Sequence, residues 1–244
     1  MKLAIATMIK CESRRYLPAL LRAWQEFADE LIVLDNNENN CDDKDLIQEV
    51  WQKSLILEWF PNAAWGNESG FRQKLFTMAQ TSDADWLLWL DADMISLRDP
   101  KPLMQHATTD AIAFPLYDLW QQQPLKYRED RFWRAHLHQR IWAIRKPSVD
   151  FIPEWATQGL HCGHLPLNYV PLRTLTAPQK YAILHYGYAD AEDRKLKHAA
   201  YMSQAEILSP QQVAHAESII DPEPNLLTLP FEPKWSIEHE SRKS

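Results

Sequence analysis

The sequence has 244 residues, of which 45% are hydrophobic and 24% charged, and its 26 lysines and arginines stand against 33 aspartates and glutamates. This is ordinary globular composition, and it excludes a disordered chain, a collagen and a coiled coil. The formal net charge of −7 gives no electrostatic footprint for nucleic acid or for an anionic membrane surface, so we expect no nucleic-acid partner.

The three cysteines, Cys11, Cys41 and Cys162, are odd in number and contain no C-x-x-C pair. This pattern favours a reducing compartment and argues against a disulfide framework or a cysteine zinc site. The apolar run at the start of the sequence is too short to span a membrane and lacks a signal-peptide cleavage site. We therefore expect a cytoplasmic protein without an integral membrane segment.

The first hundred residues alternate strand and helix patterns. The strands are expected at 2–8, 31–34, 55–60 and 86–90. The first helix has Pro18 in its first turn, and its apolar face carries Leu17, Leu21, Trp24 and Phe27. Two more helices are expected at 43–51 and at 67–80, the second with an inner face of Phe71, Leu75, Met78 and Ala79. This spacing predicts an α/β fold with a mainly parallel central sheet flanked by helices.

Ligands of parallel α/β sheets bind beyond the carboxyl ends of the strands. The polar residues that follow the predicted strands are therefore where chemistry is expected: residues 7–10, 35–37 and 91–93. The chain has only five glycines, and no two of them are separated by a single residue. Neither the G-x-G-x-x-G turn nor the G-x-x-x-x-G-K-[ST] loop is present, so phosphates must be bound without a glycine-rich cradle.

After about residue 110 the pattern changes. We expect a strand at 111–116, one or two antiparallel strands within 131–146, and a late strand at 181–188. Asp190 then caps a helix, with an inward face of Leu196, Ala200, Ser203 and Ile207.

The chain is interpreted as a single domain, 1–244, because it has no linker long enough to separate two. Its parts are a nucleotide-binding half at 1–110, an acceptor-binding half at 111–208 and a C-terminal tail at 209–244. The tail is rich in proline and only weakly periodic, so we expect it to lie extended over the surface.

The strongest chemical signal is an apolar strand that ends in Asp91 and Asp93, with one residue between them. While the chain stays extended, both carboxylates point the same way, and two like charges held close favour a cation between them. Mg²⁺ or Mn²⁺ suits such oxygen ligands. Two surface aspartates in a turn are the alternative, and the short motif alone leaves both interpretations open.

Together with other parts of the chain, these residues resemble the D-x-D motif of GT-A glycosyltransferases, especially the family-2 type. The runs 4–13 and 28–35 resemble that family's first two strands, and 70–76 is similar to its Arg-bearing helix. The run 184–188, followed by Lys197 and Tyr201, resembles the ending of family-2 enzymes that build lipopolysaccharide cores. The resemblance covers most of the chain and implies the GT-A, nucleotide-diphospho-sugar transferase fold.

The resemblance implies a hexosyltransferase that moves a sugar from a UDP- or GDP-sugar to a glycan or another hydroxyl acceptor, with inversion. Mn²⁺ or Mg²⁺ would be the cofactor, since a metal on the pyrophosphate stabilises the charge that builds as the C1–O bond breaks. The metal ligands implied are Asp91, Asp93 and His185. The nucleotide-binding residues implied are Thr7, Asp35, Arg72, Asp91 and Lys197.

An inverting transfer needs a general base near the acceptor hydroxyl. Lipopolysaccharide-type relatives tend to have His-Glu near His161, whereas this chain has Cys162 after the histidine. The catalytic candidates are therefore Glu154 and His161, with Asp118, Asp150 and Asp190 as alternatives.

Two other classes of function stay open. A haloacid-dehalogenase-type phosphohydrolase would use Asp91 as its nucleophile, but Met94 and the fourth-strand position of the motif count against it. The absence of an obvious base keeps open a non-catalytic module that binds a sugar or nucleotide on the same fold.

Overall fold

The computed structural model describes residues 1–13, 15–36, 41–60, 68–105, 108–156 and 162–239. The helices are α1 (Leu17–Phe27), α2 (Asp43–Val50), α3 (Glu68–Thr81), α4 (Lys101–Gln105), α5 (Ala191–Met202) and α6 (Pro210–Ser218). The strands are β1 (Leu3–Ile9), β2 (Glu30–Asp35), β3 (Ser54–Trp59), β4 (Trp86–Trp89), β5 (Met94–Ser96), β6 (Ala111–Phe114), β7 (Leu116–Gln121), β8 (Lys126–Arg128), β9 (Arg140–Arg145), β10 (Thr174–Thr176), β11 (Ile183–His185) and β12 (Leu226–Thr228).

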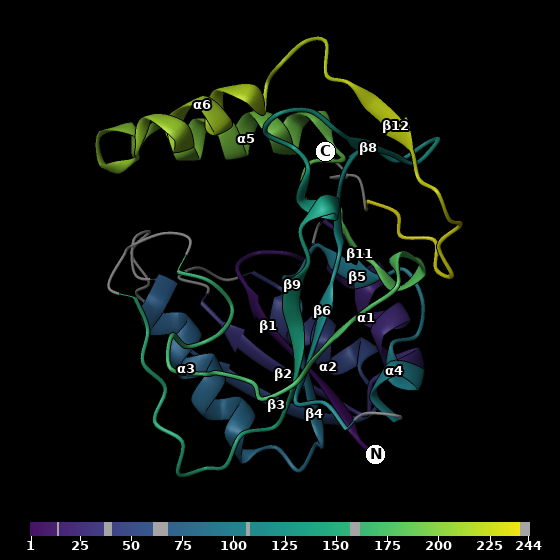
Figure 1. The fold of residues 1–244 in the computed structure, drawn as a ribbon, viewed down its shortest axis with the longest axis vertical. Helices are drawn as coiled ribbons and strands as arrows, with labels where there is room; N and C mark the ends of the chain where they lie inside the picture. The colour runs from purple at the N-terminus through teal and green to yellow at the C-terminus, as the bar shows by residue number, and fades with distance from the viewer. Residues whose placement is uncertain (14, 37–40, 61–67, 106–107, 157–161, 240–244) are drawn as a thin grey trace.

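The central sheet of the described residues has seven strands in the order β10-β6-β9-β4-β1-β2-β3. Strands β1 to β4 pair in parallel, and β9 runs antiparallel to both β4 and β6. The mainly parallel sheet flanked by helices, expected from the alternation of strand and helix patterns, is confirmed (Figure 1).

Both faces of this sheet are buried. In β1, Leu3 and Ile5 face the core that contains α1 and α2, whereas Ala4 and Ala6 face the core that contains α3. The predicted apolar faces of α1 and α3 are buried in these two cores. Burial on both sides explains why these strands are continuous apolar runs rather than alternating ones.

A second sheet, β12-β8-β7-β11-β5, was not expected from the sequence. The predicted strand at 111–116 divides at Pro115 into β6 of the first sheet and β7 of the second. Proline has no backbone N–H to donate to a ladder, so the chain changes sheets there. The predicted region 131–146 holds one strand, β9, preceded by a turn of 3-10 helix at Ala135–Leu137.

The C-terminal segment differs from the expected extended tail. It begins with α6, where Ser209 and Gln212 form a reciprocal capping box. Farther along, Trp235 and Ile237 are buried in the core of α1, with the Trp235 ring centroid 5.2 Å from that of Phe27. Figure 1 shows α5 and α6 side by side and the segment after β12 returning toward α1. The buried residues Trp235 and Ile237 therefore make this segment contribute to the folded core.

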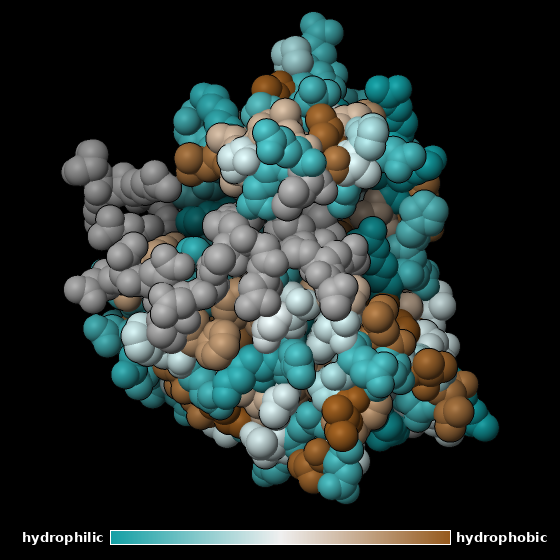
Figure 2. Space-filling view, turned by 90° about the vertical axis from the view of Figure 1, so that its left-hand side faces the viewer, coloured by the Kyte–Doolittle hydropathy of each residue, from teal (hydrophilic) through white to brown (hydrophobic). Residues whose placement is uncertain are grey.

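The long segment between β9 and β10 covers the α3 side of the sheet. Its aromatic residues Phe151, Trp155 and Tyr169 pack inward against the α3 core. Its exposed apolar side chains are Val149, Ile152, Leu167, Val170 and Leu172. Figure 2 shows hydrophobic residues among hydrophilic ones on the lower part of this side of the molecule. Across the described helices, none combines the length and apolar character needed to cross a bilayer.

Candidate active site

The carboxyl ends of β1, β2 and β4 meet at one edge of the central sheet. Thr7 lies near the end of β1 and Asp35 ends β2, and both are buried. Two backbone hydrogen bonds tie this edge together, from Asn36 N to Ile9 O at 3.1 Å and from Leu90 N to Ala6 O at 3.2 Å. The structure thus places Thr7, Asp35 and the start of the D-x-D motif at the same edge, as the strand spacing predicts.

The chain does not stay extended through the D-x-D motif, and that part of the prediction is wrong. Met94 N donates to Asp91 O at 3.0 Å, which closes a turn between the two sheets. The turn exists because the chain must leave β4 of the first sheet and enter β5 of the second. The two carboxylates consequently have different partners.

Asp91 is paired with α3. Arg72 Nη2 lies 3.2 Å from Asp91 Oδ1, and Arg72 Nε lies 3.3 Å from Glu68 Oε1. Arg72 is only 6% exposed, so it does not belong to a solvated helix face. Burial alone would raise the pKa of Asp91, but Arg72, with smaller contributions from His164 and His185, leaves the pKa below its ordinary value.

His164 is a neighbour that sequence reasoning did not assign to this site. Its ring centroid lies 4.4 Å from that of Trp142. Burial, followed by the charge of Arg72, lowers the pKa of His164 to about 3, so the imidazole is neutral at pH 7. The only sequence signal was its place three residues after His161.

Asp93 is paired with the second sheet and α5. Lys197 Nζ lies 3.3 Å from Asp93 Oδ2, and His185 Nε2 lies 3.5 Å from Asp93 Oδ1. Burial would raise the pKa of Asp93, but Lys197 and His185 overcome it and hold the pKa well below the ordinary value. Asp93 is therefore a carboxylate at any pH where the protein is handled.

His185 is held on its other side by Asp118, with 2.7 Å between His185 Nδ1 and Asp118 Oδ1. Strand register produces this contact, because β11 lies between β5 and β7 and pairs His185 with both Met94 and Asp118. Burial disfavours a charged imidazole, but Asp93 and Asp118 together raise the pKa of His185 to about 9.

Gly187 lies directly against these side chains. A Cβ atom placed on it would lie 2.5 Å from both Asp93 Oδ2 and His185 Nε2, and it would also collide with Lys197 Nζ. Beneath the ammonium, the ring of Tyr188 has its centroid 4.6 Å from Lys197 Nζ. A glycine at this position therefore lets the three polar groups approach one another and the backbone closely.

The residues present fit a divalent cation in part. Asp93 Oδ1 is buried, faces His185 Nε2, and has no hydrogen-bond partner among the described residues. Within the same described part of the chain, however, no group of three His, Cys, Asp or Glu side chains is close enough to hold a metal alone. A cation here would need further ligands from a bound molecule, such as diphosphate oxygens.

Helix α5 carries Lys197 to the site on a charged inner face. Asp190 accepts hydrogen bonds from Glu192 N and Asp193 N, which confirms it as the N-cap. The predicted inward face is wrong at two positions, since Leu196 and Ser203 are exposed; Ala200 is half-buried, and the side chain of Ile207 lies outside the described atoms. The inner face instead presents Asp193 and Lys197, which are four residues apart.

Arg15 ties α5 to the loop that follows β1. Its Nε and Nη2 donate to Asp193 Oδ2 at 2.9 and 2.8 Å, and its Nη1 donates to Glu12 Oε2 at 2.8 Å. Burial, against the opposing charge of Arg15, raises the pKa of Glu12 to about 7. Neither residue was proposed from the sequence, because their partner on α5 is about 180 positions away in the chain.

A disulfide fixes this same loop, contrary to the sequence prediction. Cys11 and Cys41 are bonded, with their Cα atoms 5.4 Å apart, while Cys162 is free and buried. Next to the bond, the buried Asp43 accepts from Glu12 N at 3.0 Å and from Ser13 N at 2.6 Å. Spacing along the chain could not reveal a pair that only the parallel pairing of β1 and β2 brings together. With two of the three cysteines bonded, the cysteine pattern no longer supports the expected reducing compartment.

Asp93, His185 and Lys197 form what is called the Asp93 cluster. The candidate bases do not all lie next to it. His161 lies outside the described residues. Glu154 and Asp150 are exposed on the segment that covers α3, and no contact among the described residues joins the Glu154 carboxylate to Asp93. Of the two remaining alternatives, Asp190 caps α5 and Asp118 contacts His185.

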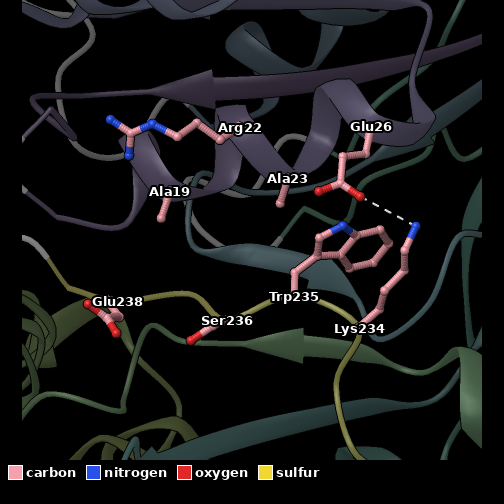
Figure 3. Close-up of a pocket in the computed structure, with 8 residues that line it drawn as sticks. All are labelled: Ala19, Arg22, Ala23, Glu26, Lys234, Trp235, Ser236 and Glu238. Atoms are coloured by element: carbon pink, nitrogen blue, oxygen red, sulfur yellow. Dashed lines mark ion pairs between the residues drawn. The ribbon is translucent and has the colours of Figure 1, made fainter.

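A cavity of about 450 Å³ lies elsewhere, between α1 and the C-terminal segment (Figure 3). It is lined by Ala19, Arg22, Ala23, Glu26, Lys234, Trp235, Ser236 and Glu238. Lys234 Nζ and Glu26 Oε2 form an ion pair across it at 3.4 Å. It shares no lining residue with the site at the end of the sheet.

No family model and no curated protein matches the sequence. Solved structures match its fold. Staphylococcus aureus TarS 1–349 in complex with UDP has a TM-score of 0.50 and 13% identity, and the match covers 90% of this chain and 70% of that one. A longer S. aureus TarS structure has a TM-score of 0.49 and 14% identity over 90% of this chain, which spans 42% of its length.

Glucosyl-3-phosphoglycerate synthase from Mycobacterium tuberculosis, solved with Mn²⁺, UDP and glucosyl-3-phosphoglycerate, matches more distantly. Its TM-score is 0.33 at 12% identity, over 48% of this chain and 44% of that one. At these identities the likeness concerns the fold alone. The architecture of this chain is the GT-A fold of nucleotide-sugar transferases.

Proposed function

We propose that this protein is a glycosyltransferase that takes its sugar from a nucleotide diphosphate donor. The observation that carries the proposal is the Asp93 cluster, in which one buried carboxylate faces His185 and Lys197, and all three lie against Gly187. It lies at the carboxyl edge of a parallel sheet, where α/β folds bind their ligands.

Asp93 and His185 would hold a divalent cation, Mn²⁺ or Mg²⁺, with Asp91 beside them. When bound, such a cation neutralises charge on the diphosphate as it departs. Lys197 carries a positive charge to the same cluster, and Arg72 carries one to the Asp91 side. Both cations are oriented by carboxylates before any ligand arrives, so they can meet diphosphate oxygens without a glycine-rich loop.

Thr7 and Asp35 would line the nucleoside end of the site, because both are buried at the ends of β1 and β2. Their side chains offer acceptors for base and ribose groups of a UDP- or GDP-sugar. The finer assignment, a family-2-like hexosyltransferase that inverts the sugar, rests on the sequence resemblance.

The acceptor would be a glycan or another hydroxyl compound. An inverting transfer needs a base that reaches its hydroxyl, and Glu154 and His161 remain the proposed residues. Both belong to the segment between β9 and β10, which continues to His164 beside Asp91. That segment is therefore where an acceptor is proposed to bind.

A thermal-shift panel of nucleoside diphosphates, with and without Mn²⁺, tests the donor site. We expect one nucleotide to stabilise the protein only when Mn²⁺ is present, by about 2.7 kcal/mol at a concentration 100 times its dissociation constant. The shift should vanish in Asp93→Ala. A shift that persists in chelator would contradict the proposal.

Catalysis is tested separately by the slow release of nucleoside diphosphate from UDP- and GDP-sugars without an acceptor. Release that depends on Mn²⁺ and is lost in Asp93→Ala supports an enzyme. Metal-dependent binding without any release, also in the presence of hydroxyl acceptors, would instead identify a non-catalytic binding module.

A further inference from the structure

His185 lies between two carboxylates on the same side of the second sheet. Its Nδ1 is 2.7 Å from Asp118 Oδ1, and its Nε2 is 3.5 Å from Asp93 Oδ1. The first distance is that of a hydrogen bond, whereas the second leaves a gap. The ring thus has one occupied nitrogen and one nitrogen that faces an unpartnered carboxylate oxygen.

We propose that Asp118 is a positioning residue that makes His185 a metal ligand. By accepting the hydrogen bond of Nδ1–H, it fixes the ring so that Nε2 faces Asp93 and can bind a divalent cation. Partner groups of this kind orient metal-binding histidines and raise their basicity. The inference rests on the proposed function, because it requires that the site holds a divalent cation with its nucleotide.

Burial makes the contact effective. The side chains of His185 and Asp118 are 12% and 11% exposed, so water competes little for the hydrogen bond. The Tyr188 ring meets His185 edge-on, with 5.1 Å between the centroids, and therefore packs against the imidazole. In a variant without an acceptor at position 118, the ring loses the group that aims it.

A second carboxylate and histidine pair in the protein serves as a comparison. His136 Nε2 lies 2.9 Å from Glu129 Oε2, and the imidazole ring packs against those of Tyr117 and Tyr127. This pair has the same chemistry but shares no contact with Asp93. Glu129→Gln is therefore a matched control for loss of a carboxylate beside a buried histidine.

The experiment measures Mn²⁺ binding to the full chain in the presence of UDP or GDP, whichever binds in the thermal-shift panel. The dissociation constant comes from the electron paramagnetic resonance signal of free Mn²⁺. Nitrogen ligation comes from ¹⁴N modulation of the spin echo of bound Mn²⁺, and His185→Asn identifies its source.

In Asp118→Ala we expect Mn²⁺ affinity to fall about 10- to 100-fold and the ¹⁴N modulation to weaken or disappear. Asp118→Asn keeps an oxygen acceptor for Nδ1–H and should restore the modulation. Glu129→Gln should change neither signal. If circular dichroism shows that Asp118→Ala does not fold, Asp118→Leu takes its place, because leucine has a similar shape and no acceptor.

If folded Asp118→Ala or Asp118→Leu shows the same ¹⁴N modulation as the wild type, the positioning role of Asp118 is overturned, while the metal site itself stands. Modulation in the wild type that His185→Asn does not remove would overturn the ligand role of His185. Failure of the wild type to bind Mn²⁺ with either nucleotide would overturn the proposed function, and this inference with it.

Discussion

The two aspartates at the edge of the sheet are two residues apart in the chain, yet they belong to regions built in different ways. Asp91 follows β4 of the first sheet and pairs with Arg72 of α3, only 19 positions earlier. Asp93 precedes β5 of the second sheet and meets Lys197 of α5, 104 positions later. The Asp91 region is assembled by neighbouring βα units, whereas the Asp93 region is assembled by strands and a helix from the far end of the chain.

The difference suggests a division of work. The Asp91 carboxylate is already engaged by Arg72, but Asp93 Oδ1 has no hydrogen-bond partner within the described residues and faces His185 Nε2 at 3.5 Å. We therefore expect ligand binding to depend more on the Asp93 region than on the Asp91 region.

The largest effect should come from Asp93→Ala, compared with Asp91→Ala. Removing Asp93 removes the carboxylate proposed to hold Mn²⁺, so we expect the affinity for nucleoside diphosphate with Mn²⁺ to fall more than about 100-fold. Asp91→Ala should cost about tenfold, which is about 1.4 kcal/mol, because Arg72 stays in place. Calorimetric titration measures both.

Asp83→Ala is the control for this pair of variants. Asp83 precedes β4, and its contact with Lys2 is exposed, so the affinity should not change. Equal losses in Asp91→Ala and Asp93→Ala would abolish the proposed difference between the two regions.

A second comparison concerns the disulfide between Cys11 and Cys41. Among the described residues, such a bond is present in the first-sheet region and not in the second. The bond closes a loop with a sequence separation of 30. The double variant Cys11→Ser, Cys41→Ser should therefore lose about 2–4 kcal/mol of unfolding free energy in urea. Cys162→Ser, at the free cysteine, is the control and should lose less. A double variant as stable as the wild type would mean that the bond does not form in solution.

Gly187→Ala tests whether the close approach of the Asp93, His185 and Lys197 side chains to this glycine matters for binding. The added methyl group meets Asp93, His185 and Lys197, and such overpacking costs about 1–3 kcal/mol. We expect metal-dependent nucleotide binding to fall together with stability.

Gly163→Ala is the matched glycine variant. Its Cβ would meet nothing within 4 Å, but its backbone φ of +85° is unfavourable for alanine, at a cost of about 1–2 kcal/mol. It should lower stability while sparing Mn²⁺ binding. If both variants kept full Mn²⁺ binding, the close packing of side chains against Gly187 would have no role in the site.

A pH dependence of stability is expected from Glu12. Its pKa is raised from 4.5 to about 7 in the folded protein, so the folded state holds a proton that the unfolded state releases. Stability should therefore fall as pH rises from about 4.5 to 7, and then level off. Urea unfolding across this range should show a flatter profile in Glu12→Gln. If unfolding free energy changed equally with pH in Glu12→Gln and the wild type, the raised pKa of Glu12 would be contradicted. The control is Glu192→Gln, because Glu192 is exposed and pairs with Lys195.

The Asp91 region could be predicted because the sequence patterns that determine it each lie within one short segment of the chain. The periodicity of α1 and α3 and the apolar runs of β1 to β4 lie within single segments, and parallel strands bring Thr7, Asp35 and Asp91 to one edge. Arg72 was proposed from the resemblance, and its position in a helix could not tell that its guanidinium is buried against Asp91.

The Asp93 region could not be predicted from the sequence in the same way. Residues 94–96 become a strand only because they pair with β11. The strand expected at 181–188 is confirmed over Ile183–His185, but its pairing with β5 and β7 could not be predicted. His185 was proposed from the resemblance, but its contact with Asp118 follows from register, which no local pattern contains. The inward face of α5 was wrong because apolar residues were expected where Asp193 and Lys197 lie.

The burial of Trp235 and Ile237 in the core of α1 has a practical consequence for shortened versions of the protein. A version cut at residue 208, where the acceptor-binding half was expected to end, would expose the side of α1 that carries Phe27. Such a fragment would expose apolar surface and aggregate, so attempts to crystallise a shortened version should keep the chain through at least residue 239.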